Sequence, residues 1–371
     1  MIQGQKKLMI PGPVEVSPEV LCALSSQIKP HYGAEWVEDY GRVIAILKKI
    51  FNTTQDVFLI AGSGTCAIDA CIGSSLQTGD QIIIGNNGFF GDRLVSVAEA
   101  NGLQVVEVKV PWGEKITPDM IEDAIQANPD AKAVAMVHCE TSTTIINPVD
   151  QIGQLTKDLD VLYIVDAVSS LGGIPYHADK WGIDLCASAT QKCLGAPPGL
   201  APVSVSQKAW QRIERTEHRS HGWYTNLEVW RRYAVDWADW HPTPVTMPSS
   251  IFYALLVALE QLMAEGIEDR LMRYRNIAIQ LRQGLREAGM QPFTTDDNLN
   301  PVLTAAYPPV GNESSDVVEY LLNRHQIQIS GGLGDLKKKI FRIGHMSPVL
   351  SEDDITRLVM ALKQFDSGQK R

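Results

Sequence analysis

The sequence has no long hydrophobic run, no excess of positive charge and no pairing pattern among its few cysteines. Over 371 residues the formal net charge is −10. No segment approaches the roughly 20 apolar residues of a membrane-spanning helix. The acidic balance argues against a surface for nucleic acid or for an anionic membrane. Neither partner is therefore expected.

The six cysteines lack the paired spacing of a zinc site or of a disulfide framework. They are typical of small core residues in a reducing compartment. The first apolar run stops at Pro11 and is too short for the core of a signal peptide. The last residues do not form a peroxisomal Ser-Lys-Leu ending. These features predict a cytoplasmic protein.

Two histidines in an aromatic-rich segment suggest a metal site at first sight. His218 and His221 lie three residues apart. A metal centre needs further ligands, and no third one stands at helical spacing from this pair. No metal is predicted.

Lys192 is the residue around which the other motifs are arranged. In residues 187–199 a short apolar run leads into small residues, and a Pro-Pro-Gly turn follows the lysine. Burial in such a segment lowers the pKa of an amine and leaves it nucleophilic toward a carbonyl group. Taken alone, the motif also fits an ordinary loop lysine, and two motifs upstream decide between these interpretations.

The first of these is a continuous apolar run over residues 161–165 that ends in Asp166. Such runs are typical of parallel strands buried on both faces, and open α/β sheets bind their ligands at the carboxyl ends of the strands. If Lys192 carries pyridoxal phosphate (PLP) as a Schiff base, an ionised aspartate here keeps the pyridine nitrogen protonated. The ring then acts as an electron sink.

The second motif, in residues 55–70, is a short apolar strand, a Gly-Ser-Gly turn and the start of a helix. Glycine lets the backbone approach an anion closely, and the free N–H groups and dipole of the helix attract phosphate. The pattern predicts a phosphate site at Ser63, Gly64 and Thr65. It lacks the glycine fingerprint of dinucleotide folds and the Gly-Lys-Thr of P-loops, which argues against both nucleotide sites.

With these motifs in this order, the chain resembles the class V aminotransferases of PLP fold type I. Within them it is most similar to the alanine–glyoxylate and serine–pyruvate aminotransferase group. The resemblance covers nearly the whole chain. It rests on residues 11–13, 88–91 and 138–143, the Asp166 strand, the Lys192 loop and residues 341–344.

The expected fold is α/β, with a large PLP-binding domain and a smaller α+β C-terminal domain. Short apolar strands alternate with helices from residue 57 to 205, which predicts a mostly parallel, seven-stranded type of sheet covered on both faces. We expect an N-terminal arm over residues 1–16, the large domain over 17–250 and the small domain over 251–371. The resemblance implies that the arm crosses to a partner subunit and borders the substrate pocket.

The resemblance assigns further residues to the cofactor. Phe90 falls where the family stacks an aromatic ring on the cofactor, often tryptophan. Thr141 matches a residue whose hydroxyl contacts the ring oxygen, and Gln191 is expected near the phosphate or the ring. Thr246 aligns with a threonine that completes the phosphate site from the other subunit of a homodimer. Thr243 falls where some relatives have a tyrosine.

Four residues are candidates for substrate contact. Arg342 lies inside an apolar strand, where a guanidinium is costly unless a carboxylate pairs with it. Its partner is either a carboxylate of the chain or, as the family position implies, the substrate carboxylate held by two hydrogen bonds. Gly12, His31 and Tyr32 are the other candidates, and an ordinary loop histidine is the alternative for His31.

These assignments predict an aminotransferase that works by a ping-pong mechanism. A small amino acid of the alanine or serine type would donate its amino group to a 2-oxo acid, glyoxylate or pyruvate. Lys192 would carry the proton away from Cα. The alternatives are a pyridoxamine–pyruvate or (S)-ureidoglycine–glyoxylate type of transaminase, or a non-catalytic PLP-binding regulatory protein.

Two departures qualify the comparison with the family. Thr144 stands where the family usually has glycine, which leaves the conformation of that turn open. A cysteine desulfurase of the same fold needs a nucleophilic cysteine on a late loop, and no cysteine follows Cys193. Desulfurase activity is therefore not expected.

Overall fold

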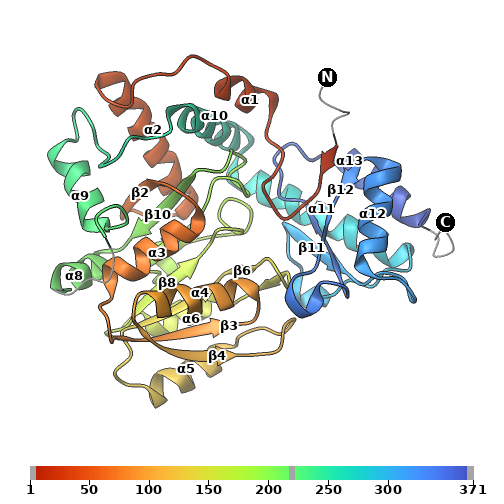
Figure 1. Cartoon of the computed structure of the whole chain (residues 1–371), viewed down its shortest axis with the longest axis horizontal. Coiled ribbons are helices and arrows are strands. Elements are labelled where there is room, and N and C mark those ends of the chain that lie inside the picture. The colour runs from red at the N-terminus through yellow and green to blue at the C-terminus, as the bar shows by residue number, and fades with distance from the viewer. Residues whose placement is uncertain (1–5, 217–221, 366–371) are drawn as a thin grey trace.

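The computed structural model describes residues 6–216 and 222–365. It consists of a larger unit built on a central sheet and a smaller C-terminal unit beside it (Figure 1). The candidate residues lie mainly in the larger unit, at one edge of its sheet.

The central sheet has seven strands in the order β2-β10-β9-β8-β5-β3-β4. Only β10 runs antiparallel to its neighbours. The mostly parallel sheet predicted from the apolar runs is confirmed by these pairings. The strands β5, β8, β9 and β10 are buried along their whole length, as the apolar runs require. In sheet order the strands are β2 (Asp56–Ala61), β10 (Leu200–Val205), β9 (Leu185–Ala187), β8 (Leu162–Asp166), β5 (Ala133–Val137), β3 (Gln81–Asn86) and β4 (Gln104–Lys109).

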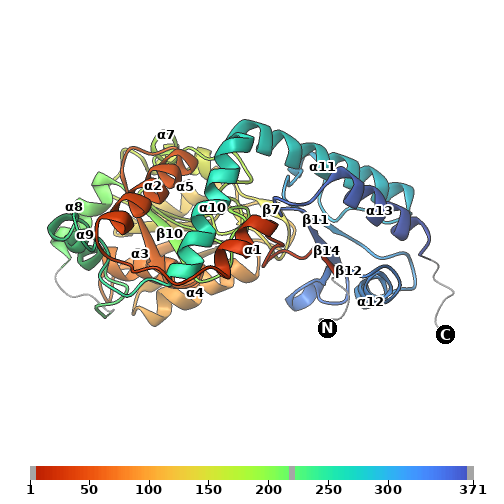
Figure 2. The same ribbon diagram turned by 90° about the horizontal axis from the view of Figure 1, so that it is seen from above.

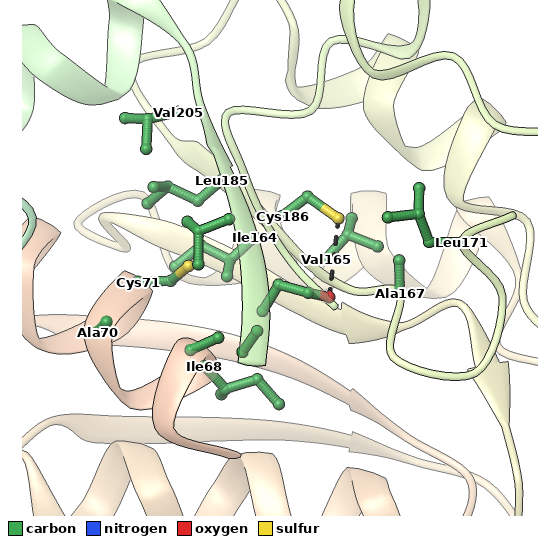
Figure 3. Close-up of a cluster of buried hydrophobic side chains, with 14 of the residues drawn as sticks. Ile68, Ala70, Cys71, Ile164, Val165, Ala167, Leu171, Leu185, Cys186 and Val205 are labelled. Carbon is green, nitrogen blue, oxygen red and sulfur yellow. Dashed lines mark hydrogen bonds between the residues drawn. The ribbon is translucent and has the colours of Figure 1, made fainter. Parts of the chain in front are cut away.

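Helices cover both faces of this sheet (Figures 1 and 2). Figure 3 shows how α3 packs, with Ile68 and Cys71 of the helix against Ile164 of β8 and Leu185 of β9. These side chains are almost fully buried, so the start of α3 is held firmly above the sheet. The helices of this unit are α1 (Pro18–Leu24), α2 (Ala34–Phe51), α3 (Gly64–Ser75), α4 (Phe89–Ala100), α5 (Pro118–Ala127), α6 (Val149–Thr156), α7 (Ala178–Trp181), α8 (Gln207–Arg215), α9 (Leu227–Asp236) and α10 (Ser249–Glu265).

The smaller unit is an antiparallel three-stranded sheet, β11-β14-β13, covered by helices. Its core joins apolar side chains of α11, α13 and β14. Short elements complete the chain. The remaining bounds are α11 (Ile267–Glu287), α12 (Ser314–His325), α13 (Glu352–Lys363), β11 (Leu303–Ala306), β13 (Ser330–Gly331), β14 (Phe341–Gly344), the hairpin strands β6 (Cys139–Glu140) and β7 (Ile145–Ile146), and the 3₁₀ turns η1 (Asp296–Asn298) and η2 (Gly334–Leu336).

The long helices α10 and α11 meet at Gly266 with a bend of 85° (Figure 2). No single helix in the described ranges is long and apolar enough to cross a membrane. Among these residues, only the bent pair of α10 and α11, taken together, has the length and apolar composition of a membrane span. The apolar side chains of α10, from Phe252 to Leu262, belong to the core of the larger unit. For this reason we propose that the two units divide at Gly266, one helix later than the expected boundary at residue 250.

The N-terminal arm lies on its own chain. Strand β1 (Lys7–Leu8) pairs in parallel with β12 (Ile327–Gln328) of the smaller unit, as Figure 1 shows. The carbonyl oxygen of Met9 then accepts a hydrogen bond of 2.8 Å from the backbone N–H of Gly344. A Cβ at Gly344 would lie 2.0 Å from the carbonyl oxygen of Ile10, so only glycine admits the arm. Residues 7–9 therefore pack on their own chain, and contact of the arm with a partner stays a prediction.

The packing of α6 on α7 yields a test of the fold. A Cβ at Gly153 of α6 would lie 1.7 Å from the carbonyl oxygen of Trp181. We expect Gly153→Ala to lower the melting temperature, because overpacking of a core costs on the order of 1–3 kcal/mol. Differential scanning calorimetry measures the change.

Gly41 of α2 provides the matched control, since a Cβ there meets no atom within 4 Å. Gly41→Ala should raise stability by about 0.5–1 kcal/mol, because alanine favours the helix over the unfolded chain. Equal melting temperatures for the two variants would contradict the described contact between α6 and α7.

Candidate active site

A cavity of about 220 Å³ opens at the carboxyl edge of the central sheet. Parallel strands end together at such an edge, so residues far apart in the sequence meet there. Eight residues predicted from the sequence line this one cavity. They are Ser63, Gly64, Thr65, Phe90, Thr141, Asp166, Gln191 and Lys192.

Lys192 follows β9 in a loop that folds back under the N-terminal arm. Its side chain is only 9% exposed, and its amine donates a hydrogen bond to the carbonyl oxygen of Pro11. Burial lowers the pKa of this amine to about 8, with a smaller contribution in the same direction from Arg342. A considerable fraction of the amine is therefore unprotonated near neutral pH, as a carbonyl nucleophile requires.

Gly12 of the arm packs directly on this lysine. Its φ angle is +102°, and a Cβ on it would lie 2.6 Å from Cδ of Lys192. The backbone N–H of Val14 donates a hydrogen bond of 3.1 Å to the carbonyl oxygen of Gln191. The arm therefore borders the site through Gly12, which makes room for the lysine, and substrate contact by Gly12 stays a prediction.

Asp166 is the last residue of β8 and lies in the same cavity, 6% exposed. One carboxylate oxygen accepts a hydrogen bond of 2.8 Å from the backbone N–H of Val168. Burial raises the pKa of this carboxyl group to about 6, and Glu140 acts in the same direction. A cation against the carboxylate would lower that pKa again, so a protonated ring nitrogen suits this position.

The start of α3 supplies donors for an anion. Ser63 caps the helix and accepts a hydrogen bond of 3.4 Å from the N–H of Cys66. No acceptor within residues 6–216 and 222–365 pairs with the backbone N–H of Gly64 or Thr65. These two N–H groups and the helix dipole are available to a phosphate group. A Cβ at Gly64 would lie 2.5 Å from the side chain of Val168. Close packing against Val168 therefore accounts for glycine at this position.

One wall of the cavity is aromatic and carries a cation. Phe90 lies in the first turn of α4, and Arg93 follows it one helical turn later. The guanidinium of Arg93 lies 5.0 Å from the ring centre of Phe90 and 5.2 Å from that of Phe89. Across the described ranges, Arg93 has no carboxylate within ion-pair distance. Sequence reasoning missed Arg93, although its spacing of three from Phe90 was a usable signal.

Another part of the cavity wall carries hydroxyl and amide groups. The hydroxyl groups of Thr141 and Ser169 lie 2.7 Å apart, and both residues line the cavity. Ser169 was also missed in the sequence. The side-chain oxygen of Gln191 is buried and has no hydrogen-bond partner in the described part of the chain. A buried acceptor without a partner is unusual and fits a ligand that donates a hydrogen bond.

Arg342 lies in β14 and reaches the far side of Thr141. Its Nε donates a hydrogen bond of 2.9 Å to the carbonyl oxygen of Gly331, and its Nη1 one of 2.9 Å to that of Thr141. No carboxylate of the described residues lies within ion-pair distance, although the side chain is only 6% exposed. Burial lowers the pKa of the guanidinium to about 10. An internal salt bridge is thus absent from this part of the chain, and a carboxylate ligand can fill that role.

Other predicted residues do not line the cavity of their own chain. Thr243 is buried and donates a hydrogen bond of 3.3 Å to the carbonyl oxygen of Val245, while Thr246 is exposed. His31 packs 5.1 Å from the ring of His241, and Tyr32 is half exposed. The pair His218 and His221 falls outside the described residues.

The turn after Thr141 keeps an unusual backbone at Thr144. Its φ angle is +59°, in the left-handed region that suits glycine and strains a β-branched residue. Its hydroxyl is buried with no partner among the residues that the structure describes. The turn thus has the conformation expected for a glycine, and the threonine bears the strain.

The residues of the cavity fit PLP. Free N–H groups at the start of α3 suit its phosphate, and the carboxylate of Asp166 suits its ring nitrogen. The buried amine of Lys192 suits its aldehyde, and Phe90 offers a ring to stack on. The unpartnered oxygen of Gln191 adds an acceptor.

Three curated relatives match almost the whole chain. An uncharacterized aminotransferase of Methanocaldococcus jannaschii is 40% identical over 97% of this chain and 94% of its own length. The small subunit of a soluble hydrogenase of Synechococcus is 35% identical over 98% of this chain and 93% of its own length. The alanine–glyoxylate aminotransferase of Mus musculus is 30% identical over 96% of this chain and 86% of its own length.

Solved structures agree in fold. The alanine–glyoxylate aminotransferase of Nostoc sp. superimposes with a TM-score of 0.93 at 30% identity, over 98% of this chain and 96% of that one. The ureidoglycine–glyoxylate aminotransferase of Bacillus subtilis superimposes with a TM-score of 0.92 at 29% identity, over 99% of this chain and 96% of that one. The pyridoxamine–pyruvate aminotransferase of Mesorhizobium loti superimposes with a TM-score of 0.90 at 27% identity, over 98% of this chain and 92% of that one.

The family model described as aminotransferase class-V matches residues 26–338. That range includes the lysine loop, the aspartate strand and the start of α3. The predicted resemblance, the α/β fold with its mostly parallel sheet and the aminotransferase activity are therefore confirmed. The chain belongs to the class V aminotransferases, the PLP-dependent transaminases of fold type I.

Proposed function

We propose that this aminotransferase moves the amino group of a small amino acid, of the alanine or serine type, to glyoxylate or pyruvate. The observation that carries the proposal is the guanidinium of Arg342, buried without a carboxylate partner in the described residues and linked through Thr141 to the cavity. A bidentate hydrogen bond to an α-carboxylate satisfies such a group.

The residues of the chain then have separate tasks. When bound, PLP supplies an electron sink for negative charge at the substrate Cα. Asp166 holds a proton on the ring nitrogen, and Arg342 holds the substrate carboxylate. Nζ of Lys192 would take the proton from Cα and pass it to C4′ of the cofactor, a transfer that a pKa of about 8 suits near neutral pH. The donor and the 2-oxo acid acceptor use the same site in turn, in a ping-pong cycle.

The alternatives differ in what they require of the site. A pyridoxamine–pyruvate type of transaminase treats the unphosphorylated vitamin as substrate and needs no phosphate site, whereas the N–H groups of Gly64 and Thr65 favour a phosphate. A non-catalytic PLP-binding protein would need no group to move a proton, and the name of the hydrogenase relative says only that it is a subunit of a soluble hydrogenase. The presence of Lys192 and Asp166 in one cavity, with Arg342 bonded to the backbone of Thr141 in its wall, favours catalysis. The (S)-ureidoglycine–glyoxylate type shares these groups, and only a panel of donors separates it.

We also propose that the enzyme works in the cytoplasm. All six cysteines are free thiols, and most are buried, as is usual for proteins of a reducing compartment. Cell fractionation tests this proposal, which fails if the protein accumulates outside the cytoplasmic fraction.

Arg342→Gln tests the function directly. In wild-type protein with PLP, we expect a panel of amino donors to yield keto acids, with glyoxylate or pyruvate as acceptor. The variant should raise KM for carboxylate-bearing donors about 10²-fold, because a charged hydrogen-bonded pair is worth roughly 1.5–3 kcal/mol. Turnover of amines without a carboxylate should change little.

Lys338→Gln is the control, since this exposed lysine makes only a surface ion pair with Glu313. Amino-acid kinetics in Arg342→Gln that match those of the control would contradict the assignment. A wild-type protein inactive on the whole panel would contradict the function itself.

We propose further that the enzyme is a homodimer whose active sites are shared between subunits. Thr246 is exposed and does not line the cavity of its own chain. Several aromatic side chains of the described residues are about half exposed, which is typical of an interface rather than of a free surface. They are Tyr32, Trp223, Tyr224, Trp237 and Trp240.

Mixing two inactive variants tests the shared site. Lys192→Ala and Thr246→Arg should each be inactive as pure proteins. A mixed dimer has one site with both defects and one with neither, so co-refolding should restore up to about a quarter of wild-type activity. If heterodimers form, shown by differently tagged chains, and activity stays at the parental level, Thr246 does not act across the interface.

A further inference from the structure

Glu140 is a carboxylate with no solvent exposure, one residue before Thr141 in strand β6. Its Oε2 accepts hydrogen bonds of 3.0 Å from the backbone N–H groups of both Phe90 and Gly91. Its Oε1 accepts bonds from the backbone N–H of Ser142 at 2.9 Å and from the hydroxyl of Ser142 at 2.6 Å. Four donors thus surround one buried charge.

No lysine, arginine or histidine of the described ranges lies within ion-pair distance of this carboxylate. Burying an unpaired carboxylate is costly, and the cost is offset only where several donors converge on it. A residue that served packing alone would be apolar here. The carboxylate is therefore required for the contacts that it makes.

These contacts cap the N-terminus of helix α4 with a side chain from another element, strand β6. The residue before the helix is Gly88, which has no side chain to bond the first N–H groups. A Cβ at Gly88 would lie 2.4 Å from Cδ of Glu140 and 2.5 Å from the hydroxyl oxygen of Ser142. The glycine thus admits Glu140 to the position of a capping side chain. Negative charge at a helix N-terminus is also favoured by the helix dipole.

The two elements that Glu140 joins both contribute residues to the wall of the active site. Helix α4 carries Phe90 and Arg93, which line the cavity. The turn after β6 carries Thr141, whose carbonyl oxygen accepts the hydrogen bond from Nη1 of Arg342. Ser142 ties the two elements again, because its hydroxyl oxygen accepts a bond of 2.9 Å from the N–H of Phe89.

From this arrangement we infer that Glu140 is a positioning residue, which sets the separation between the aromatic wall that faces the cofactor and the arginine that binds the substrate carboxylate. The inference rests on the proposed function. Glu140 touches neither ligand. It acts on the cofactor through Phe90 and on the substrate through Thr141 and Arg342.

Glu140→Gln removes the charge and keeps the size of the side chain. The amide can accept from one pair of donors but turns its NH₂ group toward the other pair, so one wall loses its support. We expect the dissociation constant of PLP and KM for the amino donor each to rise about tenfold or more. Cofactor fluorescence quenching and steady-state kinetics measure the two constants.

Asp184→Asn is the matched control. Asp184 is likewise a buried carboxylate, and it accepts bonds from the N–H of Tyr163 at 2.9 Å and the hydroxyl of Ser206 at 2.8 Å. It lies at the amino edge of the sheet, away from the cavity. The control should have a lower melting temperature than wild type, while its dissociation constant for PLP and its KM for the amino donor should stay within about twofold of wild type.

The outcomes separate positioning from stability. If Glu140→Gln lowers the melting temperature as the control does, and leaves the dissociation constant of PLP and KM for the amino donor unchanged, the role of Glu140 is structural. The inference is then overturned. A rise in only one constant also overturns it, because the residue would then serve one wall alone. Ser142→Ala, which keeps the carboxylate and all three of its backbone donors, should show a smaller rise in both constants and replaces Glu140→Gln if that variant does not fold. Wild-type transamination, measured alongside, tests the proposed function independently.

Discussion

The burial of one amine is the constraint on which the rest of the site depends. Lys192 has a pKa of about 8 because it is removed from water, and the N-terminal arm, lying across it, completes that removal. The arm is fixed in turn by β12 and by Gly344 of the smaller unit. A nucleophile of the larger unit is thus activated by contacts with the smaller one, so the two units must fold together to make the site.

Charge is distributed around this amine without direct ion pairs in the described residues. Asp166 and Glu140 are held by backbone N–H groups, and Arg342 by backbone carbonyl groups. Each charged group is therefore oriented but not neutralised by a side chain of opposite charge. That arrangement leaves Asp166 and Arg342 available to a ring nitrogen and to a carboxylate, at the cost of burying charge in the apo protein.

Much of this could be predicted from the sequence, because it depends on local signals. Buried runs such as residues 161–165 identified the strands, and strand ends identified Asp166 and the turn at Ser63. Glu140, Ser169 and Arg93 were missed, since their importance comes from contacts between elements that no local pattern encodes. The proposed shift of the boundary to Gly266 has the same cause: the amphipathic pattern of α10 shows that one face is buried, not what covers it. Thr246, His31 and Tyr32 do not line the cavity of their own chain, so their assigned roles stay predictions.

The pH dependence of PLP capture by the apoprotein tests the central claim most directly. The rate constant should be divided by that of a small model amine in the same buffers, corrected to its free-base form, so that ionisation of PLP itself cancels. If burial lowers the pKa of Lys192 to about 8, protonation is lost as pH rises through that value. The corrected ratio should then rise about tenfold per pH unit below pH 8 and level off above it, with half-maximum near pH 8. A ratio that continues to rise toward the ordinary lysine value of about 10.5 would contradict the account, because the amine would then behave as one exposed to water.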